Sequence, residues 1–288
     1  MTTLVVLAAG LASRYGSDKQ LEAVGPAGEL LLEYALHDAW RAGCERAVVI
    51  VRDELRSPLE TVLAPWGRRL PLAFAVQRPD QPVADAPRAR RKPWGTAHAL
   101  LAARPHVAGD VLVCNADDFY GASAFAGVVS TLRAAAGHAV AGYPLADTLS
   151  PHGGVSRAVC VADADARLVR IEEHTGITRD DVAITDDRGR VLPADVPVSM
   201  NLWGFRGSFF AHLDDAFHRF VREHGADERA ELRIPDVVNE RVARGDAVRV
   251  VPVRDTWFGM TYAADRPSVR GALAARVAAG EYPADLRA

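Results

Sequence analysis

Residues 7–21, LAAGLASRYGSDKQL, combine small side chains with two cations, Arg14 and Lys19. Small residues around Gly10 allow the main chain to approach a triphosphate, and its N–H groups can then bind the phosphate oxygens. Fixed cations offset the phosphate charge. The segment is therefore predicted to be a nucleotide-binding loop. Its positions nearest the phosphates are Ala8, Ala9 and Gly10.

This loop differs from two common nucleotide-binding motifs. It lacks the Gly-Lys-Ser/Thr ending of a P-loop, and no G-x-G-x-x-G dinucleotide fingerprint is present. Both classes are disfavoured. An ordinary glycine-containing turn beside two surface cations is the alternative interpretation of the segment taken alone.

Two adjacent carboxylates, Asp117 and Asp118, follow the apolar run 111–114. Open α/β sheets bind ligands at the carboxyl ends of their strands, and hard carboxylate oxygens suit Mg²⁺. A turn or helix cap is the other interpretation of such a pair. If the backbone stays extended, neighbouring side chains point to opposite sides, so the two carboxylates are not equivalent.

The first half of the chain alternates strand and helix, which predicts a parallel sheet. The loop 77–94 is rich in Pro, Asp and Arg and is expected to form a flap. Its basic cluster consists of Arg88, Arg90, Arg91 and Lys92. The expected elements are strands 4–9, 47–51, 71–76 and 110–115, and helices 29–42, 55–63, 96–103 and one within 122–135.

The second half predicts a partly antiparallel arrangement, because strands follow one another without intervening helices. A turn is expected at 186–189, where the sequence is Asp-Asp-Arg-Gly. The expected strands are 140–143, 155–162, 168–173, 196–205 and 247–253, and the expected helices are 208–223, 230–244 and 267–279. The predicted fold class is α/β, with a Rossmann-like, mostly parallel central sheet, helices on both faces and a smaller, partly antiparallel portion.

Five further motifs follow the opening loop in the order found in one family. The chain resembles the nucleotidyltransferase superfamily, with the fold of sugar-phosphate nucleotidylyltransferases and MobA-like NTP transferases. The motifs are KPWGTAHAL (92–100), NADDFYG (115–121), GGVSR (153–157), VSMNLWGF (198–205) and WFGMTYAADR (257–266). Their combination covers nearly the whole chain and is far more specific than any one of them. The resemblance implies a single domain of residues 1–288, with a nucleotide-binding half (1–135) and an acceptor-binding half (136–288).

The resemblance also implies roles for individual residues. Arg14, Lys19 and Asp117 correspond to catalytic positions, and Asp117 to the Mg²⁺ ligand. The nucleotide-binding positions are Ala8, Ala9, Gly10, Gln77, Gly95 and Thr96, and the acceptor-binding positions are Gly154, Glu173 and Asn201. Gln77 could read a pyrimidine edge, since an amide offers both a donor and an acceptor; a solvated glutamine at a strand end is the alternative.

The chain departs from the family pattern near its C-terminus. Many relatives carry a second metal-binding carboxylate in a W-x-D motif, whereas this chain has Gly259 at that place. Asp118, Asp255 and Asp265 are nearby substitutes. A helix cap or an ion pair is the competing role for Asp255 and Asp265.

Composition excludes several classes of function. The net charge of −3 gives no basic field for nucleic acid, and no apolar run is long enough for a membrane span or fits a signal peptide. A cytoplasmic location is therefore expected. The three cysteines lack the spacing of a disulfide framework or zinc site. A homo-oligomer is compatible with the sequence.

The predicted activity is Mg²⁺-dependent transfer of a nucleoside monophosphate from an NTP, with a pyrimidine base favoured, to a sugar 1-phosphate or a similar phosphorylated acceptor. Pyrophosphate and an NDP-sugar would be the products. Two alternatives stay open: a cytidylyltransferase acting on an alcohol phosphate or phosphonate, and a catalytically silent subunit that senses nucleotide or takes part in assembly.

Overall fold

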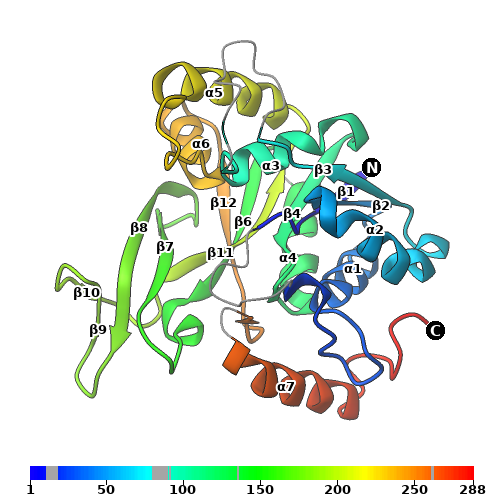
Figure 1. Cartoon of the computed structure of the whole chain (residues 1–288). Coiled ribbons are helices and arrows are strands. Elements are labelled where there is room, and N and C mark those ends of the chain that lie inside the picture. The colour runs from blue at the N-terminus through cyan, green and yellow to red at the C-terminus, as the bar shows by residue number, and fades with distance from the viewer. Residues whose placement is uncertain (11–18, 80–89, 91, 135, 261–262) are drawn as a thin grey trace.

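The computed structural model describes residues 1–10, 19–79, 90, 92–134, 136–260 and 263–288. In the first half, four parallel strands lie in the order β3-β2-β1-β4 (Figure 1). They span Thr2–Leu7 (β1), Arg46–Val51 (β2), Leu72–Val76 (β3) and Asp110–Asn115 (β4). The apolar runs of β1, β2 and β4 are buried on both faces, as central strands of a parallel sheet require, whereas β3 lies at the edge and is partly buried.

Helices cover both faces of this sheet because successive strand residues point to opposite sides. Leu4 and Val6 belong to one core, with residues of α1 (Leu31–Arg41) and α4 (Ala122–Ala134). Val5 belongs to the other core, with residues of α3 (Thr96–Ala102), α5 (Phe209–His224) and α6 (Ile234–Ala243). The remaining α-helices are α2 (Asp53–Leu63) and α7 (Arg266–Ala278).

The second half extends the same sheet with mostly antiparallel strands; β12 pairs parallel with β6. β11 (Pro197–Phe205) pairs antiparallel with β4 and joins the two halves, and it also pairs with β6 and β7. The other strands are β6 (His138–Pro144), β7 (Val155–Ala162), β8 (Leu168–Arg179), β9 (Ile184–Thr185), β10 (Val191–Leu192) and β12 (Val248–Pro252). The predicted α/β architecture, parallel first and partly antiparallel afterwards, is confirmed.

Two short elements join distant parts of the chain. β5 (Asp118–Phe119) pairs antiparallel with β13 (Phe258–Gly259) in a separate small sheet. This pair places the motif after β4 directly against the motif of residues 257–266. Short 3-10 helices occur at Lys19–Leu21, Ala64–Arg68, Arg104–His106, Leu145–Thr148 and Ala263–Asp265.

Several predicted boundaries were wrong. β8 continues six residues beyond Glu173, through a polar stretch that carries no strand signal of its own, and with β9 and β10 it forms an arm that projects in Figure 1. α6 begins at Ile234 rather than at residue 230, and Pro235 occupies its first turn. The turn at 186–189 is confirmed, since Gly189 N donates to Asp186 O at 3.0 Å. Residues 80–89 and 91 of the predicted flap lie outside the described residues.

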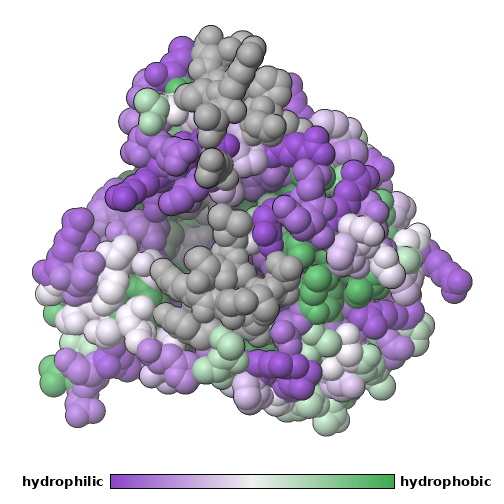
Figure 2. Space-filling model, in the orientation of Figure 1, coloured by the Kyte–Doolittle hydropathy of each residue, from purple (hydrophilic) through white to green (hydrophobic). Residues whose placement is uncertain are grey.

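The structure has a mostly hydrophilic visible face (Figure 2) and three buried cysteines. The face in Figure 2 is mostly hydrophilic, with hydrophobic residues in separate patches. Cys44, Cys114 and Cys160 are buried free thiols. Within the described ranges, no helix has both the length and the apolar character needed to cross a membrane.

Candidate active site

A cavity of about 510 Å³ opens at the carboxyl ends of the parallel strands β1, β3 and β4. It brings together six residues that the sequence predicted for the site: Ala9, Gly10, Gln77, Gly95, Thr96 and Asp117. Ala8 lies behind them, fully buried, and its N–H donates to Ile50 O at 2.8 Å. Arg14 falls in residues 11–18, outside the described part of the chain.

Lys19 and Asp117 form an ion pair at this cavity. The Lys19 Nζ atom contacts Asp117 Oδ2 and also donates to Met260 O at 3.3 Å. Met260 N in turn donates to Asp117 O at 2.9 Å. The loop lysine, the aspartate after β4 and the segment after β13 therefore meet at one point, although they are far apart in the sequence.

Asp118 turns away from Lys19 into a buried position, as the non-equivalence argument predicted. Its Oδ2 atom accepts a hydrogen bond from Asn115 Nδ2 at 2.8 Å. Burial, followed by the charge of Asp117, raises the pKa of Asp118 to about 7. Gly259 lies directly opposite on β13, and a Cβ atom there would stand only 2.4 Å from Asp118 Oδ1. Glycine at 259 leaves the space that the Asp118 carboxylate occupies.

The donor atoms at this point fit Mg²⁺. Asp117 and Asp118 offer hard carboxylate oxygens, and Mg²⁺ commonly binds one or two carboxylates together with phosphate oxygens and water. No cluster of three His, Cys, Asp or Glu side chains suited to a metal occurs among the residues described. A Mg²⁺ ion here would depend on nucleotide phosphates for part of its coordination.

Asn201 supports Asp118 through a chain of hydrogen bonds. The Trp203 indole donates to Asn201 Oδ1 at 2.7 Å, Asn201 Nδ2 donates to Asn115 Oδ1 at 2.8 Å, and Asn115 Nδ2 donates to Asp118. Because an indole N–H can only donate, it fixes the orientation of both amides. Asn201 has a φ of 69°, within a bulge of β11, a conformation rare for a non-glycine residue.

None of the three predicted acceptor residues, Asn201, Glu173 and Gly154, lines the 510 Å³ cavity. Glu173, on β8, forms an ion pair with Arg233 at 3.5 Å. Gly154 borders a second cavity, described below. Of the proposed substitutes for a second carboxylate, Asp255 accepts a hydrogen bond from Ser123 N at 2.8 Å at the start of α4, a capping role, and Asp265 lies 3.8 Å from His152.

Gln77 is held in one orientation at the cavity wall. Its Nε2 atom donates to Gly95 O at 3.1 Å and lies 3.2 Å from His98 Nδ1. A carbonyl only accepts, so the amide nitrogen is identified and His98 Nδ1 must act as an acceptor. Burial lowers the pKa of His98 to about 4, which keeps the ring neutral, and the ring stacks on Phe217 at 4.8 Å. The Gln77 oxygen is left to accept a hydrogen bond from a ligand.

Two charged residues of this cavity, Lys92 and Glu231, were not among the predicted site residues. Lys92 belonged to the predicted basic cluster, but Glu231 carries no local signal. Glu231 lies at the cavity because the loop before α6 packs closely on Gly95. Gly95 has a φ of 98°, and a Cβ atom added there would lie 2.4 Å from Leu232 O. Thr96 adds to this contact, since its Oγ1 accepts from Ile234 N at 3.0 Å.

Arg90, from the same basic cluster, has a structural role. Its guanidinium lies 3.8 Å from the Trp94 ring centroid and donates to Asp227 O at 2.7 Å. Trp94 itself is fully buried, and its indole donates to Pro79 O at 2.8 Å. Trp94 therefore serves packing.

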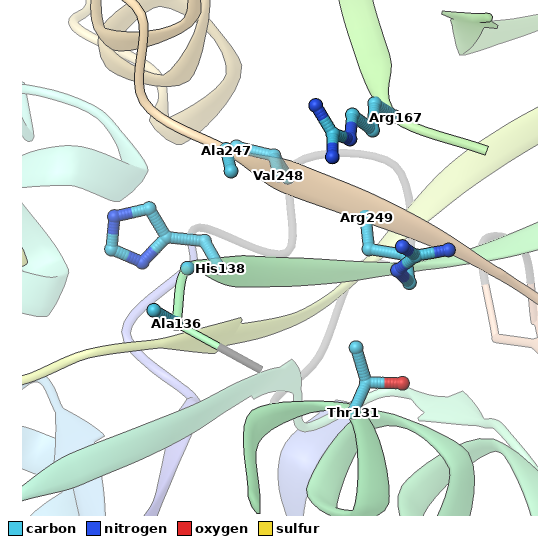
Figure 3. A pocket seen from close by; sticks show the side chains of 8 residues that line it. Thr131, Ala136, His138, Arg167, Ala247, Val248 and Arg249 are labelled. Carbon is cyan, nitrogen blue, oxygen red and sulfur yellow. The ribbon is translucent and has the colours of Figure 1, made fainter. Parts of the chain in front are cut away.

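A smaller cavity of about 180 Å³ lies between α4 and β12 (Figure 3). Thr131 projects toward it from α4, and Arg249 belongs to β12 (Figure 3). None of the predicted site residues borders it. It takes no part in the candidate active site.

Residues 4–167 match the model of the MobA-like NTP transferase domain, which is more than half of the chain. The chain belongs to this family. The suspected nucleotidyltransferase superfamily is thereby confirmed. The match of the MobA-like domain spans the loop with Lys19, the Asp117 motif and the GGVSR motif (153–157). No curated protein matches the chain.

Solved structures share the fold over almost the whole chain. The inositol-1-phosphate CTP transferase from T. maritima has 16% identity and a TM-score of 0.66 over 94% of both chains. A putative glucose-1-phosphate thymidylyltransferase from Bacillus anthracis has 14% identity and a TM-score of 0.66 over 95% of both. A UDP-glucose pyrophosphorylase in complex with UDP-glucose has 15% identity and a TM-score of 0.63, over 96% of this chain and 99% of its own. At these identities the likeness establishes the fold.

Proposed function

We propose that the protein transfers a nucleoside monophosphate from a Mg²⁺-bound NTP, with a pyrimidine base favoured, to a sugar 1-phosphate or similar acceptor. The observation that carries the proposal is the Lys19–Asp117 ion pair beside the cavity lined by Gly10, Gly95 and Thr96. A nucleotide in this cavity would have cationic and carboxylate groups at its phosphate end. The similar structures named above are nucleotidyltransferases with pyrimidine products or substrates.

The reaction is an in-line displacement at the α-phosphorus. An acceptor phosphate oxygen forms a new P–O bond, the bond from the α-phosphorus to the bridging oxygen breaks, and its electron pair leaves with pyrophosphate. Such transfers depend on positioning and charge stabilisation rather than on a protein nucleophile. Mg²⁺, when bound, would supply further neutralisation of phosphate charge.

The residues of this chain position and stabilise the reacting groups. Lys19 is proposed to exchange part of its contact with Asp117 for an oxygen of the acceptor or α-phosphate, since an ammonium has three donors. Asp117 would hold the divalent ion, with Asp118 behind it as support, and Arg14 is proposed to stabilise the pyrophosphate. Gln77, with its oxygen free to accept, would contact an N–H of the base.

One experiment decides between this function and its alternatives. Purified protein is incubated with Mg²⁺, each of UTP, dTTP, CTP, ATP and GTP, and a panel of sugar 1-phosphates, alcohol phosphates and phosphonates, and pyrophosphate release is measured. Turnover with a sugar 1-phosphate supports the proposal. Turnover only with CTP and an alcohol phosphate supports the cytidylyltransferase, which the likeness to an inositol-1-phosphate CTP transferase makes the second candidate. Nucleotide binding without any turnover supports the silent subunit.

A further inference from the structure

A second cavity, of about 500 Å³, adjoins the β5–β13 pair. Asp117 lines the first cavity, whereas Gly259, which faces Asp118, lines the second. The two cavities therefore lie on either side of the segment Asp117–Asp118. The walls of the second combine an indole, Trp257, with the hydroxyl groups of Ser150 and Ser156. The Thr148 hydroxyl is fully buried and hydrogen-bonded within the protein, to Leu145 O and Arg157. An aromatic face beside hydroxyl groups suits a polyol or sugar ring.

Arg157, on β7, supplies the cation of this second cavity. Its Nε atom donates to Thr148 Oγ1 at 3.1 Å, its Nη2 atom to Thr148 O, and its Nη1 atom to Ser156 O at 2.8 Å. A guanidinium carries five N–H groups, so one N–H remains on each terminal nitrogen. Two N–H groups on neighbouring nitrogens match two oxygens of one phosphate.

The charge of Arg157 has no direct counter-ion. No carboxylate of the described residues lies within ion-pair distance of its guanidinium, which stands over the Trp257 ring at 5.1 Å. Burial lowers the pKa of Arg157, and the more distant charges of Asp118 and Glu173 oppose that shift. A largely buried cation whose hydrogen-bond partners are all neutral favours binding of an anion.

We propose that the second cavity binds the phosphorylated acceptor and that Arg157 binds its phosphate group. The inference rests on the proposed function, because it assigns the acceptor side of the same reaction. The acceptor phosphate would lie between the Arg157 guanidinium and the Asp117–Asp118 segment, opposite the nucleotide cavity. The ring or polyol would lie among the hydroxyl groups and against Trp257. Gly154, predicted from the sequence as an acceptor residue, lines the same cavity.

Inorganic phosphate is the probe that tests this site without turnover. Its affinity is measured by calorimetry for the wild type, Arg157→Gln, Arg157→Lys and Arg190→Gln. Gln at position 157 keeps polar contact with Thr148 but lacks the charge and the paired N–H groups. Arg190→Gln is the matched control, because it removes the same charge from an exposed arginine that lines neither cavity. We expect Arg157→Gln to weaken phosphate binding at least tenfold, Arg157→Lys to be intermediate, and Arg190→Gln to change it less than twofold. Equal binding by Arg157→Gln and wild type overturns the proposal, as does an equal loss in Arg190→Gln.

A measurement on the unaltered protein covers the case in which Arg157 variants fail to fold. Phenylglyoxal modifies accessible arginines, and peptide mass spectrometry reports each site. Phosphate should protect Arg157 while Arg190, whose exposed guanidinium pairs with Asp186, stays reactive. Equal modification of Arg157 with and without phosphate contradicts the site.

The two proposals fail in different ways. If phosphate binds through Arg157 but no NTP and acceptor pair releases pyrophosphate, the function is wrong and the anion site stands. If turnover occurs and Arg157→Gln leaves the KM for the acceptor unchanged, the function stands and the assignment of Arg157 is wrong. A rise in acceptor KM of tenfold or more, with NTP KM within twofold of wild type, supports both.

Discussion

Asp118 and Gly259 face each other across the β5–β13 pair, and a Cβ atom on Gly259 would lie 2.4 Å from Asp118 Oδ1. The carboxylate cannot retreat without losing its hydrogen bond from Asn115. The glycine at the place of the family's second carboxylate is therefore coupled to the presence of Asp118. A side chain can occupy one position of this pair only at the expense of the other.

Gly259→Ala is expected to lower the free energy of unfolding by about 1 to 3 kcal/mol, the usual cost of forcing extra volume into a packed site. Urea denaturation measures it. Gly271→Ala is the matched control, because Gly271 lies in α7 with no atom within 4 Å of the added Cβ. The control should be neutral or slightly stabilising. A loss in Gly271→Ala as large as that in Gly259→Ala would contradict the steric account.

Asp117→Asn should reduce turnover by at least about a hundredfold, because it removes the charge that contacts Lys19 and would hold Mg²⁺. Asp118→Asn should be milder, since Asp118 lies behind that contact. Pyrophosphate release against Mg²⁺ concentration is measured for both variants, with thermal unfolding as the folding control. Near-normal activity and Mg²⁺ dependence in Asp117→Asn would show that Asp117 is not the Mg²⁺ ligand.

If Gln77 reads the base, UTP, dTTP or CTP should be used better than ATP or GTP, and Gln77→Leu should raise the KM of the preferred NTP. Loss of one matched hydrogen bond costs about 1 to 3 kcal/mol, or roughly 5- to 150-fold. Initial rates with the five triphosphates measure the preference. A purine preference would show that Gln77 has another role.

His98 should contribute to the pH dependence of stability. Its folded pKa of about 4 lies below the unfolded value of roughly 6.5, so the unfolded chain binds the extra proton between these values. The contribution is complete above about pH 6.5 and is lost as the pH falls toward 4. In His98→Phe, unfolding free energies at pH 5.0 and 7.5 should differ less than in the wild type. His218→Phe, at a half-exposed position, should keep the wild-type difference; an unchanged difference in His98→Phe would mean that the ring is not neutral in the folded protein.

The parallel half of the fold and the nucleotide cavity were predictable from the sequence because their signals are local. Apolar runs marked β1 to β4, and the residues just after those strands had to meet at one edge of the sheet. The β5–β13 pair was not predictable, because two-residue strands have no periodicity. The pairing of Asp118 with Gly259 and the approach of Glu231 depend on contacts between segments far apart in the sequence.

The hydrogen bonds of Asn201 also could not be predicted from the sequence. Its motif predicts contact with an acceptor, which stays a prediction, whereas the structure shows its side chain between Trp203 and Asn115. Its positive φ follows from a bulge in β11, which no local residue pattern indicates. Arg157 was visible only as part of a motif, since its lack of a counter-ion emerges from the packing of β7 against the 145–149 segment.

The hydrogen-bond chain that begins at Trp203 lets a residue of the apolar interior determine which atoms donate and which accept at Asp118. Each of the two amides could be rotated by half a turn with almost no change in shape, and either rotation would turn a donor into an acceptor at the next link. The indole of Trp203, a fully buried residue of β11, removes this ambiguity from a position that lines neither cavity. The direction in which Asp118 receives its hydrogen bond is thus decided by Trp203, a buried residue of the antiparallel half that lines neither cavity.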